Sequence, residues 1–110
     1  MENEKIIPGT PFIFSNSIAY QPEGIVSKRI IQQEKGNITL FAFDTGQKLS
    51  EHTAPFDALV QVMEGNAEIV IGGDSNQLTA GQSIIMPANV PHAVNATERF
   101  IMLLTMIRGQ

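Results

Sequence analysis

Turn-forming residues recur at short intervals along this sequence, and runs rich in β-branched and aromatic residues lie between them. Short strands separated by closely spaced turns are typical of a β-sandwich or a β-barrel. Helix signals are poor, and the one candidate is a single turn within residues 14–20, capped by Ser15 or Asn16. We expect strands at residues 25–32, 38–44, 58–64, 67–71, 83–86, 92–96 and 99–107.

Two of the turns predict hairpins. Glu64-Gly65-Asn66 separates two strand-like runs, and Gly65 can adopt the positive φ that a tight turn needs. A second turn is expected within residues 72–76, which begin with two glycines. Gly81 marks a further turn, and Pro87 ends the strand that follows it.

Size and composition restrict the class of protein. The 110 residues suffice for one domain, and 43% of them are hydrophobic, which suits a globular chain with a core. The net charge of −4 comes from 7 basic and 11 acidic residues without a basic cluster, so we expect no nucleic-acid partner. The chain has no cysteine, which excludes disulfides, thiolate metal sites and a cysteine nucleophile.

The apolar segments are too short for a membrane span. The longest run, Phe100–Leu104, falls far below the roughly 18 residues of a membrane-spanning helix. It predicts instead a strand that is buried on both faces. The first ten residues are charged and lack the apolar core of a signal peptide. We therefore expect a cytoplasmic protein with no membrane partner.

The two histidines of the chain lie in similar sequence contexts, each a short distance after a glycine. Five residues separate Gly46 from His52, and five separate Gly81 from Pro87, shortly before His92. With Gly65, these residues resemble in order and spacing the two sequence motifs of the small single-domain cupins, an RmlC-like jelly-roll family. The motifs span about half of the chain, and the strands on either side extend the match over most of it.

The resemblance implies an all-β fold, a single cupin-type jelly-roll β-barrel formed by residues 25–110. Residues 1–24 would be an N-terminal segment outside the barrel. Phe12, Phe14 and Tyr20 make this segment more apolar than a free tail. They either cover one end of the barrel or contact a second subunit, and a homodimer is expected.

In metal-binding cupins, two histidines and a glutamate of the first motif and a histidine of the second hold one divalent metal ion. The resemblance places His52 and His92 at two of these four positions. Ala54 and Ala58 occupy the other two, and neither can donate to a metal. The resemblance therefore implies a degenerate metal site, with a divalent transition metal bound weakly by His52 and His92.

Three acidic residues are candidates to complete such a site. Asp57 precedes Ala58 but faces the other side of the strand unless a bulge shifts the register. Asp44 ends a strand, and Glu51 neighbours His52 on the opposite face. Other interpretations need no metal: the two histidines could be hydrogen-bonded to backbone or water, or could serve as an acid and a base.

The same alternation of side chains predicts a ligand pocket. The space that small aliphatic residues leave beside the histidines could hold a small apolar or weakly polar molecule. The alternative is that Phe41, Phe43 or a methionine side chain fills this space as ordinary core. The residues predicted to line the pocket are His52, Ala54, Ala58, Val60, His92 and Val94.

Three functions remain open at this point. The first is binding of a small molecule in the barrel cavity beside a degenerate metal site, which Ala54 and Ala58 favour. The second is a metal-dependent enzyme of the dioxygenase or isomerase type that uses His52, His92 and a non-standard third ligand. The third is a module that acts through protein contacts. A hydrolase has no support, because no serine or cysteine nucleophile is placed beside the histidines.

Overall fold

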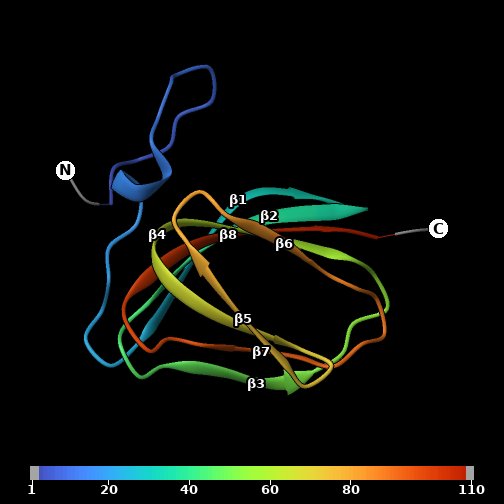
Figure 1. Ribbon diagram of the computed structural model, residues 1–110. Helices are drawn as coiled ribbons and strands as arrows, with labels where there is room; N and C mark the ends of the chain where they lie inside the picture. Colours follow the sequence, from blue (N-terminus) through green and yellow to red (C-terminus); the bar gives the residue numbers. More distant parts are fainter. Residues whose placement is uncertain (1–2, 109–110) are drawn as a thin grey trace.

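The computed structural model describes residues 3–108, which form a barrel of antiparallel strands preceded by an N-terminal segment (Figure 1). No helix among these residues is long and apolar enough to cross a membrane. A single 3₁₀ turn, η1, precedes the strands at Phe14–Asn16. The strands are β1 (Ile25–Gln33), β2 (Gly36–Phe43), β3 (Lys48–His52), β4 (Ala58–Ile71), β5 (Asp74–Thr79), β6 (Ser83–Met86), β7 (His92–Asn95) and β8 (Phe100–Ile107).

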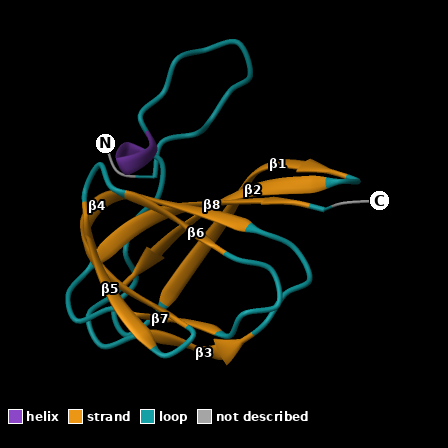
Figure 2. Ribbon diagram, turned by 45° about the vertical axis from the view of Figure 1, so that its right-hand side comes forward, coloured by secondary structure: helices purple, strands orange, loops and turns teal. Residues whose placement is uncertain are grey.

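The strands form two layers that share the long strand β4 (Figures 1 and 2). The larger layer, sheet A, has the order β1-β2-β8-β4, with β6 on the other side of β4. The smaller layer, sheet B, contains β3, β7, β4 and β5. This architecture confirms the predicted all-β barrel.

The passage of β4 from sheet A to sheet B depends on Gly65. Residues 58–65 pair with β8, and residues 66–71 pair with β5 and β7. A bulge before Glu64 and a φ of 79° at Gly65 mark the change of sheet. A Cβ at Gly65 would collide with the carbonyl oxygen of Arg99. The hairpin predicted at Glu64-Gly65-Asn66 is therefore wrong, because the glycine permits a close backbone approach within one continuous strand.

Two strands were missing from the expected set, β3 and β5. Both are polar and largely exposed, so they lack the apolar alternation by which a strand is recognised. The turn expected across residues 72–76 is only two residues long, because β5 already begins at Asp74. The 3₁₀ turn has Ile13 at its N-cap, without a side-chain cap from Ser15 or Asn16.

The barrel interior is filled largely by aromatic and aliphatic side chains. Its core joins Phe43 and Phe100, whose rings stack with centroids 4.5 Å apart, to Met102 on β8. Phe41 packs beside Phe43 at a centroid distance of 6.2 Å. As predicted, the first half of β8 is buried on both faces, since Ile101 belongs to a second cluster on the outer side of sheet A.

The N-terminal segment covers part of that outer side. Phe14, Ile18 and Tyr20 pack there against a patch that includes Leu40 and Leu103. Ile18 is almost completely buried, with 2% of its surface exposed. Phe14 and Tyr20 therefore lie on the outer face of sheet A of their own chain, not across an end of the barrel.

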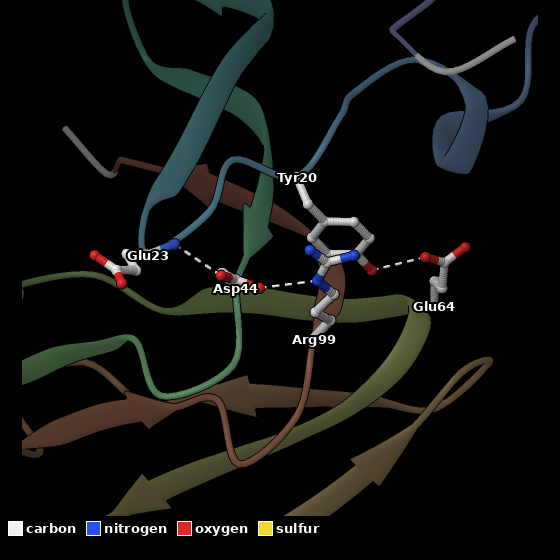
Figure 3. Close-up of polar contacts among 5 residues, drawn as sticks. All are labelled: Tyr20, Glu23, Asp44, Glu64 and Arg99. Carbon is white, nitrogen blue, oxygen red and sulfur yellow. Dashed lines mark hydrogen bonds and ion pairs between the residues drawn. The ribbon is translucent and has the colours of Figure 1, made fainter.

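A polar cluster ties the end of this segment to the barrel (Figure 3). The guanidinium of Arg99 lies over the ring of Tyr20 at 4.8 Å, and its Nε donates to Asp44 at 2.8 Å. The Tyr20 hydroxyl donates to Glu64 at 2.7 Å, and the backbone N–H of Glu23 donates to Asp44 at 2.7 Å. The hydrogen bond from Arg99 is the main reason why the pKa of Asp44 lies below its usual value.

Candidate functional site

The two histidines meet where β3 and β7 pair in sheet B. His52 ends β3, His92 begins β7, and the two residues are direct cross-strand partners. Their Nε2 atoms lie 3.1 Å apart, and their ring centroids 4.3 Å apart. His92 is buried, with 5% of its surface exposed, whereas His52 is exposed. The pair therefore links the barrel interior to solvent.

The other nitrogen of each ring faces a backbone carbonyl oxygen. Nδ1 of His52 lies 2.9 Å from the oxygen of Ser50, and Nδ1 of His92 lies 3.3 Å from that of Val90. A carbonyl oxygen only accepts hydrogen bonds, so each contact is a hydrogen bond in the form of the ring that carries a proton on Nδ1. In a neutral imidazole the Nε2 atom is then an acceptor. If both rings adopt this form, two acceptors face each other at 3.1 Å.

Three arrangements reconcile the two Nε2 atoms: an Nε2–H tautomer of one ring that donates to the other ring, a shared extra proton, or a cation between them. Burial lowers the pKa of His92 below its usual value, the hydrogen bond to Val90 opposes this, and the neighbouring His52 lowers the pKa further. A proton is therefore disfavoured at His92. A metal cation would use the lone pairs of both Nε2 atoms.

The geometry of the pair fits two neighbouring ligands of one metal ion. Two nitrogen ligands at about 2.1 Å from a metal ion would be about 3.4 Å apart in a tetrahedral site and about 3.0 Å apart at the right angle of an octahedral site. The observed separation between Nε2 of His52 and Nε2 of His92 is 3.1 Å. In addition, histidine ligands usually donate their second N–H to a carbonyl or a carboxylate, as the Nδ1 atoms here do.

The acidic candidates lie away from the histidine pair or make other bonds. Asp57 accepts a hydrogen bond from the backbone N–H of Ala88 at 2.8 Å, and Asp44 is bound to Arg99. Glu51 is exposed on β3. Within residues 3–108, no group of three or more histidine, cysteine, aspartate or glutamate side chains is placed to hold a metal ion. Among these residue types in the described part of the chain, His52 and His92 are the pair that the fold brings together.

The remaining residues of the predicted pocket lie at different depths. Val60 and Val94 are buried in the core cluster that contains Phe43, so the deep part of the predicted space is packed. Ala58 is also buried, and its cross-strand partners are Met86 and Met106. Ala54 lies in the loop before β4, half-buried. Of the predicted lining residues, the ones that solvent reaches are therefore His52 and, in part, Ala54.

Three further residues shape this end of the barrel. Asn37 and Thr39 are buried on β2 and pair with Met106 and Leu104, whose side chains face the interior. The Thr39 hydroxyl donates to Asn37 Oδ1 at 3.2 Å. Asn89, which has a φ of 64°, donates its backbone N–H to the Ala54 carbonyl at 2.7 Å and fixes the loops beside the histidines. The alternation of side chains along residues 38–44 could have predicted that Thr39 faces the interior, whereas Asn37 was expected to lie in a turn.

Comparison with known proteins identifies one family. The model of the cupin domain matches residues 39–107, which is more than half of the chain and contains both histidines. Among proteins with curated descriptions, none matches this sequence.

Solved structures show the same fold. A conserved protein of unknown function from Streptococcus pyogenes superposes with a TM-score of 0.91 at 31% identity, covering 100% of this chain and 96% of that one. A cupin 2 conserved barrel domain protein from Leptotrichia buccalis has a TM-score of 0.80 at 38% identity, covering 83% and 44%. Salicylate 1,2-dioxygenase from Pseudaminobacter salicylatoxidans has a TM-score of 0.71 at 18% identity, covering 76% and 26%, and is similar in fold alone.

Proposed function

This chain belongs to the cupin domain family, and we propose that it binds a small molecule at the mouth of its barrel, beside a degenerate metal site formed by His52 and His92. The observation that carries the proposal is the 3.1 Å contact between the two Nε2 atoms, with each Nδ1 directed at a carbonyl oxygen. This arrangement leaves two lone pairs directed at one point.

The affinity for metal should be modest. Two neutral imidazoles supply no negative charge to offset a divalent cation, and water or a ligand must complete the coordination. A metal bound there would act as a Lewis acid toward an oxygen of the ligand. The carbonyl oxygens of Ser50 and Val90 would accept from Nδ1–H of the two rings, which leaves each Nε2 available to a metal.

The ligand is expected to be small and weakly polar. Val60, Val94 and the stacked rings of Phe43 and Phe100 pack the deeper interior, so the ligand is confined to the outer end. Buried polar groups can orient a ligand in a mostly apolar pocket. Apart from His92, the buried polar side chains on the interior face of the described strands are Asn37 and Thr39.

The alternative is a metal-dependent enzyme of the dioxygenase or isomerase type. Catalytic metal sites usually have three protein ligands and one open position. Within the described residues, no three histidine, cysteine or acidic side chains are placed to hold a metal ion. The binding function is therefore the one that the geometry supports better.

Titration calorimetry of chelator-treated, tag-free protein with zinc and nickel chloride tests the proposal. The chain has only two histidines and no cysteine, so the signal of nitrogen coordination comes from this pair. We expect one weak, reversible site per chain, lost in His52→Ala and in His92→Ala and weakened as the pH falls and the imidazoles protonate. Lys48→Ala, an exposed change on the same strand as His52, is the control that should bind as the wild type does.

Two results would contradict the proposal. Absence of binding at millimolar metal would show that the pair shares a proton instead. One metal per chain retained through dialysis against chelator would show a third protein ligand, and Asp57→Asn would be the first variant to examine. The double variant Ala54→His and Ala58→Glu, which restores the family pattern, should raise the affinity by several orders of magnitude.

A further inference from the structure

Two methionines lie together on the interior face of sheet A. Met86 ends β6, Met106 lies near the end of β8, and both pair directly with Ala58 at the start of β4. Cross-strand partners point to the same face of a sheet, so the three side chains share one face. Both methionines pack in the interior core cluster, Met86 with 4% of its surface exposed and Met106 half-buried. The small side chain of Ala58 between them leaves the two thioethers as the reactive groups of this part of the sheet.

The course of the chain brings these methionines to the end of the barrel that holds the histidines. Residues 53–57 lead from His52 to the start of β4, and residues 87–91 lead from the end of β6 to His92. These two loops run side by side at one end of the barrel, and a backbone hydrogen bond of 2.7 Å joins them (Figures 1 and 2). His92 shares the face of Val94, which belongs to the interior core cluster. The buried histidine of sheet B and the methionines of sheet A therefore extend into the same end of the interior.

The ligands that meet at this end carry no negative charge. Within residues 3–108, no acidic side chain joins the histidine pair in a group that could hold a metal ion. Neutral imidazoles and thioethers leave the charge of a bound cation uncompensated, and this costs less for a monovalent cation than for a divalent one. Soft ligands such as thioether sulfur select copper(I), and imidazole nitrogen binds copper as well. The combination of two histidines with methionine therefore favours copper(I).

We propose that this end of the barrel holds a copper(I) ion through His52, His92 and the thioether of Met86, Met106 or both. The inference rests on the proposed function, because it takes the histidine pair as a metal site, and it adds the identity of the metal and of the further ligands. The exposed ring of His52 is the part of the site that an ion meets first from solvent. Zinc sites in proteins use cysteine, histidine and carboxylate ligands, so zinc would gain only the histidines here.

Methionine methyl NMR tests the thioether contact. Protein labelled with ¹³C at the methionine methyl groups is titrated with silver nitrate in chloride-free buffer, because silver(I) is a soft monovalent ion that stays in one oxidation state. The methyl signal of Met86, Met106 or both should shift up to an equimolar amount of silver. The signal of Met63, which packs on the outer side of sheet A, is the internal control and should stay in place. If neither Met86 nor Met106 shifts more than Met63, the proposal is wrong.

Copper(I) affinity tests the same ligands by substitution. Met86→Leu combined with Met106→Leu removes both thioethers and nearly keeps the side-chain volume, so the fold should tolerate the change. Competition with bicinchoninate under ascorbate measures copper(I) binding, and calorimetry measures zinc binding. The double variant should bind copper(I) about tenfold or more weakly and zinc as the wild type does. Met63→Leu is the matched control and should change neither affinity.

The outcomes separate this proposal from the proposed function. If the wild type binds zinc but not copper(I), or if the double variant binds copper(I) as tightly as the wild type, the methionine ligands are wrong and the histidine site stands. If the wild type binds neither metal, both are wrong. His52→Ala should weaken the binding of both metals, because both use the histidine pair.

Discussion

Zinc should stabilise the fold through the histidine pair, and the size of the effect can be worked out from the number of ligands. Structural zinc sites with four ligands bind with about 10–16 kcal/mol. Two ligands of four give roughly half of this, about 5–8 kcal/mol, which corresponds to a Kd between about 1 μM and about 0.2 mM. At about 1 mM free zinc the folded state then gains about 1–4 kcal/mol.

This gain is large enough to measure by thermal unfolding. For a chain of this length, 1 kcal/mol corresponds to a shift of about 4 °C in Tm, so zinc should raise Tm by about 4–16 °C. Differential scanning calorimetry at pH 7.5 with and without zinc measures the shift. His52→Ala is the decisive variant, because His52 is exposed and its loss disturbs little packing.

The result that would refute the reasoning is an equal zinc-induced shift in the wild type and in His52→Ala. Such a result would place the bound zinc elsewhere on the protein. Magnesium chloride at the same concentration is the control for ionic strength, and it should not change Tm, since Mg²⁺ prefers oxygen ligands and retains its water.

Three further predictions concern stability. Gly65→Ala should lower the free energy of unfolding in urea by more than about 2 kcal/mol, because a Cβ at this positive φ meets the Arg99 carbonyl. A loss smaller than about 2 kcal/mol would argue against the close approach of the two backbones. Ala58→Phe should cost about 1–3 kcal/mol, because Ala58 is packed in the core, and a neutral result would reveal an open cavity. The fold lowers the pKa of His92, so this residue contributes to the free energy of unfolding above its unfolded pKa, and the contribution is lost as the pH falls through the lower folded pKa. The midpoint of urea unfolding should therefore decline less between pH 8 and pH 5 in His92→Asn than in the wild type.

The sequence predicted the barrel because, in most of its strands, apolar and polar residues alternate or the residues are continuously apolar. The strands with apolar faces were recognised, and β8 was correctly expected to be buried on both sides. Strands β3 and β5 could not be recognised, because their residues face solvent and their stability comes from backbone pairing with β7 and β4. Gly65 was misassigned because a positive φ serves a turn and a bulge equally well.

At the candidate site, the sequence predicted which residues meet but not how they are joined. The two motif histidines do face each other, as their positions in the cupin motifs implied. The Nδ1 contacts are made with the carbonyl oxygens of Ser50 and Val90, and the position of a backbone oxygen cannot be read from a sequence. The burial of Asn37 was equally hidden, because it depends on the pairing of β2 with β8.

The central claim is tested most directly by ¹⁵N NMR of the two imidazole rings, which reports which nitrogen of each ring carries a proton. The spectra are recorded on chelator-treated protein at pH 8, before and during the addition of zinc. With zinc, the account predicts that both rings carry the proton on Nδ1 and that both Nε2 resonances move as the metal binds. Without metal, one ring should carry its proton on Nε2 and donate it to Nε2 of the other ring. An Nε2–H tautomer on either ring in the zinc-loaded protein, or Nε2 resonances that ignore zinc, would contradict the claim that His52 and His92 form a metal site.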